Sequence, residues 1–338
     1  MTIFGGTLPP FPEGGAFRRF SSFSGLAALS SGSKGPADAG WPLHGRRMTG
    51  GPRRDERRGA GSRRPVAIAY VNEMKERLER FARLSGFTAA CFDELASTND
   101  TARDPRYGAG DVVLAERQTA GRGQRGNSWS SGTGLNLTFS VVLCPEFLPA
   151  ARQFYVSKVV ALAVCDALAR WGIGARIKWP NDIYIGDRKT AGILIENDLC
   201  GGYMARSVVG VGLNVNQTRF DASLPNPVSM ALAAGRSFDR AEVFETFYRC
   251  LSERYGALAE ERDRSIDDDY LARLYRLGER HAFVDGRTGA RFVGTIRDVL
   301  PTGDLVVETG SGIRRYLFKE IEYVIGTQPD GRNFPEGM

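Results

Sequence analysis

The sequence predicts an α+β protein in which a large region of interspersed helices and strands is followed by a small β-barrel. A chain of 338 residues is long enough for one large domain and a small one. Helical and strand patterns are interspersed along residues 67–277. Residues 278–330 hold only short strand patterns separated by glycine-containing turns, which is typical of a small barrel. No apolar run approaches the roughly 18 residues of a membrane span, so no membrane contact is expected.

Apolar residues at helical spacing predict two helices in the first half of the large region, over residues 67–84 and 154–171. Strands are expected over residues 87–95, 112–116 and 135–143. In the last of these, apolar residues alternate with polar ones, which is the pattern of a strand with one buried face. Residues 117–129 are too rich in glycine for a helix or strand and are predicted to form a loop.

A hairpin is predicted near the middle of the chain. Strand-like runs over residues 177–185 and 190–196 flank the turn sequence Gly186-Asp187-Arg188. The next strand, over residues 207–215, has valine and leucine on one face, and Gly210, Gly212 and Asn214 on the other. A ligand could lie flat on this glycine face; alternatively, the glycines relieve crowding under a helix.

Two helices and a series of short strands complete the prediction. Asp239 and Glu242 form a capping arrangement for a helix that extends to Tyr255, and a helix over residues 266–277 stops at Gly278. Short strands are expected over residues 282–285, 291–300, 304–308 and 314–318.

The histidine and cysteine content disfavours several kinds of site. His44 and His281 are the two histidines, so a hydrolytic triad or a histidine-rich metal site is not expected. The five cysteines are far apart and form no C-x-x-C pair, which disfavours a zinc site and dithiol redox chemistry. They are interpreted as buried thiols in a reducing compartment, which predicts a cytoplasmic protein.

The excess positive charge lies at the N-terminus. The chain has a net charge of +6, and residues 1–65 alone hold 11 basic and 4 acidic residues, so the remainder is close to neutral. Residues 1–66 are rich in glycine, serine, proline and arginine and lack periodic apolar positions, which predicts a disordered extension. An RNA-contacting arm, an organelle transit peptide and a dispensable extension are the three interpretations of this segment.

The glycine-rich loop contains the pattern Gly121-x-Gly123-x-x-Gly126, which matches the dinucleotide fingerprint in spacing. That fingerprint opens a helix, whereas this segment leads toward Trp129 and a strand, so a Rossmann site is rejected. Backbone N–H groups and the side chains of Arg122 and Arg125 could instead converge on the oxygens of an anion. A solvated basic loop is the alternative.

The predicted hairpin places an acid and a lysine on one accessible face. If its turn has two residues, Asp182, Tyr184 and Lys189 share a face, while Ile183 and Ile185 point into the core. This arrangement is either part of a reactive site or an ordinary surface ion pair, which is worth less than about 1 kcal/mol.

Five segments of the chain occur in a recognisable order and spacing: Ser97-Thr98-Asn99, residues 118–126, residues 178–182, residues 188–194 and residues 210–215. Together they resemble the motifs of biotin protein ligases, also called biotin–[acetyl-CoA-carboxylase] ligases. The resemblance extends more loosely over residues 88–327 and does not cover the N-terminal extension.

The resemblance implies a fold and an activity. The fold is a mixed β-sheet flanked by helices over residues 67–277, similar to class II aminoacyl-tRNA synthetases, with an SH3-like barrel over residues 278–330. The activity joins biotin to ATP, forming biotinyl-5′-AMP and pyrophosphate. The biotinyl group then passes to a lysine of the biotin carboxyl carrier domain of acetyl-CoA carboxylase or of another biotin-dependent carboxylase. Mg²⁺ should bridge ATP oxygens, mostly through waters, so no protein metal site is predicted. A homodimer is possible.

The resemblance also implies site residues. Catalysis is assigned to Lys189, Arg122 and Asp182: Lys189 would stabilise charge on the biotin carboxylate and the α-phosphate, and Asp182 would orient or deprotonate the acceptor lysine. The implied biotin-binding residues are Ser97, Thr98, Asn99, Gln118, Gly121, Arg122, Gly123, Gln124, Lys189 and Gly192. The implied ATP- and adenylate-binding residues are Arg122, Arg125, Trp129, Lys178, Asn181 and Asn214. Residues 216–230 would form the mobile loop that covers the adenine.

The chain departs from the family pattern in two places. Many relatives have arginine where Gln124 stands and a basic residue where Asn127 stands, so retention of the adenylate could differ. Residues 1–66 lack the two helices of a winged helix-turn-helix, so we expect a monofunctional ligase with no DNA partner.

Two alternative functions stay open at this point. A lipoate or octanoate ligase of the same superfamily would share the fold and chemistry, although the segment over residues 178–182 argues against it. A non-catalytic nucleic-acid-binding or regulatory protein would act through the basic N-terminal extension.

Overall fold

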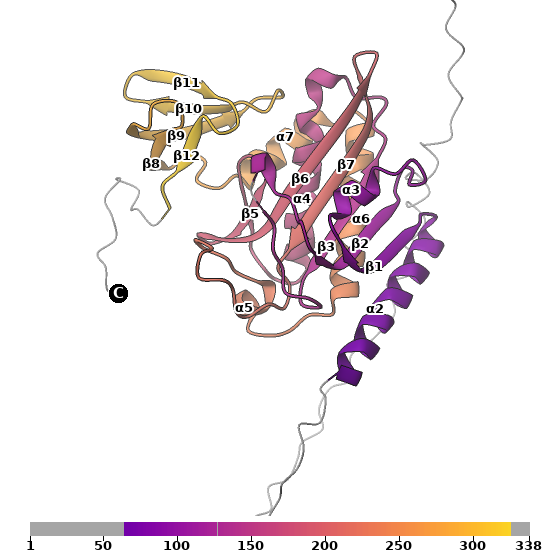
Figure 1. The fold of residues 1–338 in the computed structure, drawn as a ribbon. Helices are drawn as coiled ribbons and strands as arrows, with labels where there is room; N and C mark the ends of the chain where they lie inside the picture. The colour runs from indigo at the N-terminus through magenta and orange to yellow at the C-terminus, as the bar shows by residue number, and fades with distance from the viewer. Residues whose placement is uncertain (1–63, 127, 326–338) are drawn as a thin grey trace, which may run out of the picture.

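The computed structural model describes residues 64–126 and 128–325, which form two β-sheets with helices packed around the larger one (Figure 1). The predicted disorder of residues 1–66 lies almost wholly outside the described residues. Within the described ranges, no helix combines the length and the apolar character needed to cross a membrane.

The larger sheet has seven strands in the order β1-β2-β3-β7-β6-β5-β4. Strands β1 and β2 are parallel, and every other neighbouring pair is antiparallel, which confirms the expected mixed sheet. The strands span Ala89–Leu95 (β1), Val112–Gln118 (β2), Leu137–Leu143 (β3), Arg176–Lys178 (β4), Asp182–Ile185 (β5), Arg188–Cys200 (β6) and Tyr203–Leu213 (β7).

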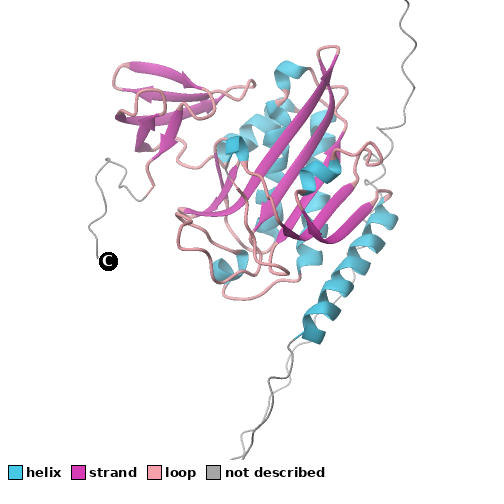
Figure 2. Ribbon diagram, viewed as in Figure 1, coloured by secondary structure: helices cyan, strands magenta, loops and turns pink. Residues whose placement is uncertain are grey.

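One face of this sheet is covered by the long helices α4 (Phe154–Arg170) and α6 (Arg240–Ala259), which lie behind the strands in Figure 2. Helix α4 is apolar along most of its length and is largely buried. Helix α2 (Arg64–Ser85) packs beside β1 and α6, and α7 (Asp263–Ala272) packs against α4 and α6. The side chain of Asp239 caps α6 as predicted, by accepting two backbone N–H bonds.

Helix α7 ends earlier than predicted. The backbone of Ile177 in β4 bonds with Arg273 and Tyr275, so this segment follows the edge of β4 instead of continuing the helix. The pairing beyond Ala272 therefore replaces the last turns of the expected helix over residues 266–277.

The opposite face of the sheet carries the short helix α3 (Thr98–Ala102), which the sequence did not predict. Ser97 caps it, and it packs on β2, β3 and β7. As a result every residue of β3 is buried. The expectation of one buried face for this strand was wrong because α3 and the adjoining loop cover its polar side, which includes Thr138 and Ser140.

The strand-like run over residues 177–185 is two strands, β4 and β5, separated by Trp179-Pro180-Asn181, and the Trp179–Pro180 peptide is cis. Trp179 turns into the core, where its indole Nε1 donates a hydrogen bond of 2.9 Å to the carbonyl of Gly303. The β5–β6 hairpin with Gly186 and Asp187 at its turn is confirmed.

The C-terminal sheet comprises five antiparallel strands in the order β11-β10-β9-β8-β12. They span Arg280–Asp285 (β8), Arg291–Val299 (β9), Leu305–Thr309 (β10), Gly312–Tyr316 (β11) and Ile321–Tyr323 (β12). Strand β12 is too short to have been predicted. The sheet joins the larger region through buried contacts, among them a hydrogen bond from the buried Lys158 of α4 to the Val299 carbonyl. A last short helix, α5 (Met230–Ala234), precedes α6.

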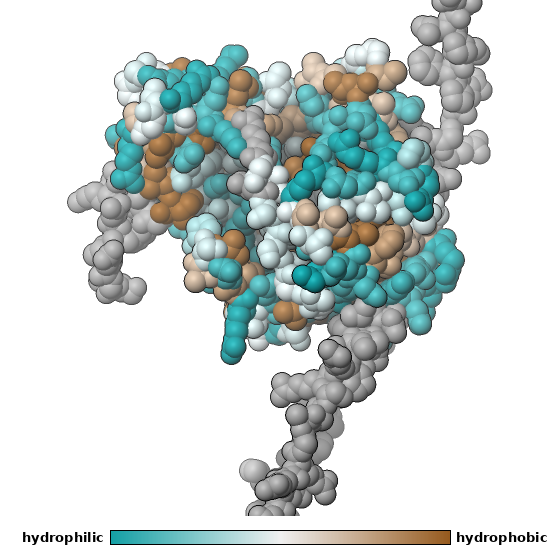
Figure 3. Space-filling view, in the orientation of Figure 1, coloured by the Kyte–Doolittle hydropathy of each residue, from teal (hydrophilic) through white to brown (hydrophobic). Residues whose placement is uncertain are grey.

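The face that Figure 3 shows carries separate apolar patches within a largely hydrophilic surface.

Candidate active site

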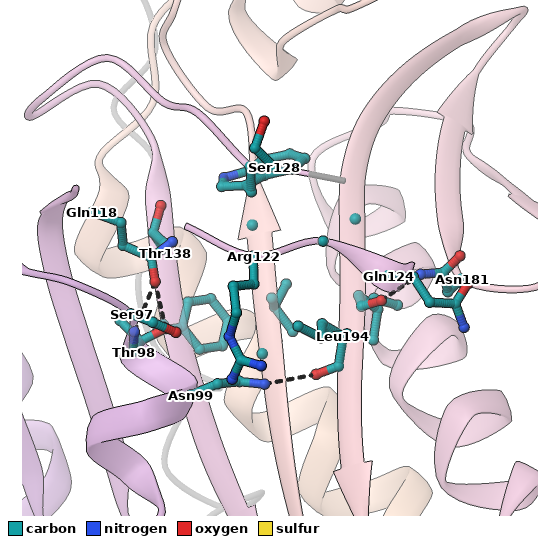
Figure 4. A pocket seen from close by; sticks show the side chains of 18 of the residues that line it. Ser97, Thr98, Asn99, Gln118, Arg122, Gln124, Ser128, Thr138, Asn181 and Leu194 are labelled. Atoms are coloured by element: carbon teal, nitrogen blue, oxygen red, sulfur yellow. Dashed lines mark hydrogen bonds between the residues drawn. The ribbon is translucent and has the colours of Figure 1, made fainter. Parts of the chain in front are cut away.

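A pocket lies on the sheet face opposite α4 and α6, between α3, the glycine-rich loop and the β5–β6 hairpin (Figure 4). Figure 4 places Thr98 and Gln118 at one end and Asn181 at the other, with Arg122 between them. Twelve predicted site residues line it: Ser97, Thr98, Asn99, Gln118, Arg122, Gly123, Gln124, Trp129, Asn181, Asp182, Lys189 and Gly192. Residues 97–99, 118–129 and 181–192 are far apart in the sequence and meet at this pocket.

The α3 end of the pocket is a connected set of polar groups. The backbone N–H of Thr98 donates to Gln118 Oε1 at 2.7 Å, and the Thr98 hydroxyl is 3.1 Å from the same oxygen. Ser140 Oγ lies 2.8 Å from Thr98 Oγ1 and 2.6 Å from Asn99 Oδ1. Because their neighbours fix them, these hydroxyl and amide groups are pre-arranged for a ligand that offers both donors and acceptors.

The two glycines of β7 make room for side chains that form the pocket. A Cβ at Gly210 would lie 2.3 Å from Asn99 Oδ1, and one at Gly212 would lie 2.1 Å from the indole of Trp129. Gly210 lies under helix α3, as the crowding interpretation expects, and both glycines line the pocket, so the ligand interpretation stays a prediction. The indole Nε1 of Trp129 is buried and has no partner among the described residues, so it is a donor that a ligand could use.

The position of Arg122 is set by Glu196 of β6, a residue that sequence reasoning missed. The guanidinium donates to both Glu196 carboxylate oxygens, at 3.1 and 2.9 Å, and to Asp100 at 2.5 Å. Glu196 also accepts from Asn99 Nδ2 at 2.8 Å and from Arg103 at 3.3 Å. Burial raises the pKa of Glu196, but the hydrogen bonds from Asn99 and Arg122 and the nearby arginine charges outweigh it, so the pKa is lowered.

A carboxylate flanked by two lysines occupies the hairpin end of the pocket. Lys189 Nζ lies 2.6 Å from Asp182 Oδ1, and Lys178 Nζ lies 3.7 Å from Asp182 Oδ2. The Lys189 ammonium is 5.9 Å from the centre of the Trp129 ring. The predicted sharing of one face by Asp182 and Lys189 is confirmed, and it places a cation where a ligand anion would meet it.

Comparisons with known proteins agree with this geometry. Residues 91–214 match the family model "Biotin/lipoate A/B protein ligase family". The chain is 31% identical over 239 residues to the bifunctional ligase/repressor BirA of Bacillus subtilis, covering 68% of this chain and 72% of the relative. The chain belongs to the biotin protein ligases.

Other relatives of these ligases extend the match. The biotin–[acetyl-CoA-carboxylase] ligase of Paracoccus denitrificans is 33% identical over 210 residues, which cover 59% of this chain and 85% of the relative. The structure of the Aquifex aeolicus biotin protein ligase in complex with biotin and ATP superposes with a TM-score of 0.60 at 26% identity, and the match covers 70% of this chain and 98% of that one. These relatives do not favour the lipoate or nucleic-acid alternatives.

Some of the site residues expected of a biotin protein ligase do not line the pocket. A Cβ at Gly121 would lie 2.3 Å from the Trp129 carbonyl, so this glycine lets the two ends of the loop over residues 121–129 approach each other closely. Asn214 is buried, and its amide donates to the Val228 carbonyl at 3.1 Å. Lys178 does not line the pocket itself, but its Nζ lies 3.7 Å from Asp182, which does, and 4.8 Å from the ring centre of Tyr323 in the C-terminal sheet. The side chain of Arg125 and the whole of Asn127 lie outside the described residues.

The described part of this ligase contains no group of three histidine, cysteine, aspartate or glutamate side chains that could hold a metal ion. Asp182 is the carboxylate that lines the pocket, and it is engaged by lysine. The donor set therefore fits a metal ion that reaches the site bound to ATP phosphates better than a resident metal.

Proposed function

We propose that this chain adenylates biotin with ATP and transfers the biotinyl group to a lysine of a biotin carboxyl carrier domain. The observation that carries the proposal is the placement of the Lys189–Asp182 pair at one end of a pocket whose other end is the polar group around Thr98 and Gln118. An elongated ligand with a ureido ring at one end and a carboxylate at the other matches this distribution of charge.

The polar end holds the ureido ring. Its carbonyl accepts hydrogen bonds and its two N–H groups donate them, and both Thr98 and Asn99 offer groups of each kind. Trp129 lies over Gly212 and covers the apolar middle of the ligand, while Arg122 closes the side that faces solvent. Exclusion of water protects a mixed anhydride from hydrolysis.

The first step forms the adenylate. An oxygen of the biotin carboxylate attacks the α-phosphorus of ATP, the bond to the β-phosphate oxygen breaks, and pyrophosphate leaves. Lys189 turns from Asp182 to the reacting oxygens and stabilises their charge, in a role that a side chain 34% exposed can perform. A Mg²⁺ ion bound to ATP would supply further charge neutralisation on the phosphates.

The second step transfers the biotinyl group. The acceptor lysine amine attacks the carbonyl carbon, its proton passes to Asp182, and AMP leaves with the anhydride oxygen. Asp182 is the candidate for this role because it lines the pocket, and it is free to accept a proton once Lys189 has turned to the substrate oxygens.

The remaining parts of the proposal concern the whole protein. The antiparallel C-terminal sheet supports an SH3-like barrel over residues 278–330. A cytoplasmic location, a carboxylase carrier domain as partner and the residue ranges of the domains stay predictions, as do a homodimer and the absence of a DNA-binding segment.

Biotin-dependent exchange of labelled pyrophosphate into ATP tests the proposal, with lipoate and octanoate as control acids. We expect exchange with biotin alone in the full chain, and its loss in Lys189→Ala. Exchange only with lipoate or octanoate would assign the chain to the alternative ligases. A chain lacking residues 1–63 should keep the activity, and loss of exchange would show that the extension belongs to the enzyme.

A further inference from the structure

Lys178 lies near two tyrosine rings, next to the pocket carboxylate Asp182. Its Nζ lies 4.8 Å from the ring centre of Tyr323 in β12 and 5.4 Å from that of Tyr184 in β5. Its side chain is 17% exposed. Aromatic faces attract a cation most strongly where water is excluded. The Tyr323 ring belongs to the C-terminal sheet, so only Lys178 separates that sheet from the pocket residue Asp182.

Asp182 is shared by two cations, one on each oxygen. Lys189 is close to Oδ1 and Lys178 is farther from Oδ2. The carboxylate is itself only 17% exposed. A carboxylate at this depth without a cation would be strongly destabilised, because burial penalises an unpaired charge. When Lys189 leaves for the substrate oxygens, Lys178 is therefore the cation that stays with Asp182.

We propose that Lys178 is the counter-ion that keeps Asp182 paired while Lys189 acts on the substrate, and that Tyr323 is a positioning residue that holds Lys178 in place from the C-terminal sheet. This inference rests on the proposed function and adds to it a link between the two sheets. The expectation that Lys178 contacts ATP phosphates is the competing prediction for this residue, and the test below separates the two roles.

Tyr323 is fixed independently of Lys178. Strand β12 pairs with β8, and the Tyr323 ring packs against Phe283 at 5.3 Å and Tyr275 at 6.1 Å between ring centres. The hydroxyl of Tyr323 is buried without a partner among the described residues. The ring, and not the hydroxyl, is thus what acts on Lys178.

The charges around Lys178 agree with this role. Burial lowers its pKa, the charge of Asp182 opposes this effect, and the charges of Lys189 and Arg276 add to the lowering. Departure of Lys189 removes one of these repulsive charges, which strengthens the pairing of Lys178 with Asp182 during the reaction.

The test measures biotin-dependent pyrophosphate exchange in the full chain, with kcat and the KM for ATP determined separately. Lys178→Met and Tyr323→Leu should each lower kcat by about tenfold with the KM for ATP changed less than about twofold. Tyr323→Phe should retain the wild-type kcat within about twofold because it keeps the ring. Phe292→Leu is the matched control, since Phe292 stacks in the C-terminal sheet on Phe283 and Tyr316 and has no contact with Lys178. It should lower the unfolding temperature without changing kcat.

Three results would overturn the inference. A raised KM for ATP with unchanged kcat in Lys178→Met would show that Lys178 binds phosphate. Equal loss in Tyr323→Leu and Phe292→Leu would show that the ring only stabilises the sheet. Equal loss in Tyr323→Phe would show that the hydroxyl is what matters. If the wild-type chain exchanges with no acid, the proposed function fails, whereas an active wild type with unaffected variants refutes this inference alone.

Discussion

Glu196→Gln tests whether the two hydrogen bonds from Arg122 to the Glu196 carboxylate set the affinity for biotin. The substitution keeps the length of the side chain but removes its charge, and one carboxylate oxygen becomes an N–H donor facing other donors. A hydrogen bond to a charged group contributes about 1.5–3 kcal/mol. Arg122 is 42% exposed and keeps its bond to Asp100, so the net loss is smaller, about 1–2 kcal/mol, which weakens biotin binding by about 5–30-fold.

Calorimetric titration with biotin provides the assay, and Arg103→Gln provides the control. Arg103 contacts the same carboxylate at 3.3 Å, but it is exposed and does not line the pocket, so its loss should change the affinity by less than about twofold. Wild-type affinity in Glu196→Gln would refute the argument. An equal effect of both variants would show that general loss of charge, and not the position of Arg122, is responsible.

Three further predictions concern neighbouring features. Gly212→Ala should abolish pyrophosphate exchange, because its Cβ would displace the indole of Trp129; an active variant would show that the indole is not needed. Arg240→Leu should lower the free energy of unfolding in urea by about 3–5 kcal/mol, because it leaves the buried Glu116 carboxylate unpaired, and a smaller change would show that water reaches that carboxylate. The stability that the Glu196 carboxylate contributes should be fully present above the ordinary glutamate pKa of about 4.3 and should be lost as the pH falls through the lowered pKa of the folded state. The difference in unfolding temperature between the wild type and Glu196→Gln should therefore shrink at low pH. A difference that does not change with pH would contradict this.

Contacts between residues that are close in sequence, or that lie on matched strands, could be predicted. The Asp182–Lys189 pair follows from a two-residue hairpin turn and strand alternation. The glycine pattern of β7 likewise predicted a face with little side-chain bulk. The prediction that Ser97 and Gly192 belong to one site depended on the family resemblance. Sequence spacing alone does not show that such distant segments lie together.

The rest depended on tertiary packing. Helix α3 has only five residues, too few for a helical period to show, and its cover over β3 buries Ser140 from a side that alternation suggested was exposed. Glu196 escaped notice because its partners Asn99 and Arg122 are 97 and 74 residues away in sequence. The direction of Lys178 depends on Tyr323, whose strand has three residues.

The contact of Trp179 with the loop between β9 and β10 limits where the chain of this enzyme can be cut into separate domains. Trp179 stands between Lys178 and Asn181, yet its indole N–H is bonded to the Gly303 carbonyl, and the ammonium of Lys158 relies partly on the Val299 carbonyl. A fragment ending at residue 277 would lose both carbonyl acceptors and would expose the apolar ring of Trp179, which is now buried, to water. The larger region is therefore not expected to fold correctly without the C-terminal sheet. A chimera with a different C-terminal sheet would have to place carbonyl groups at both positions to keep the conformation of residues 178–182.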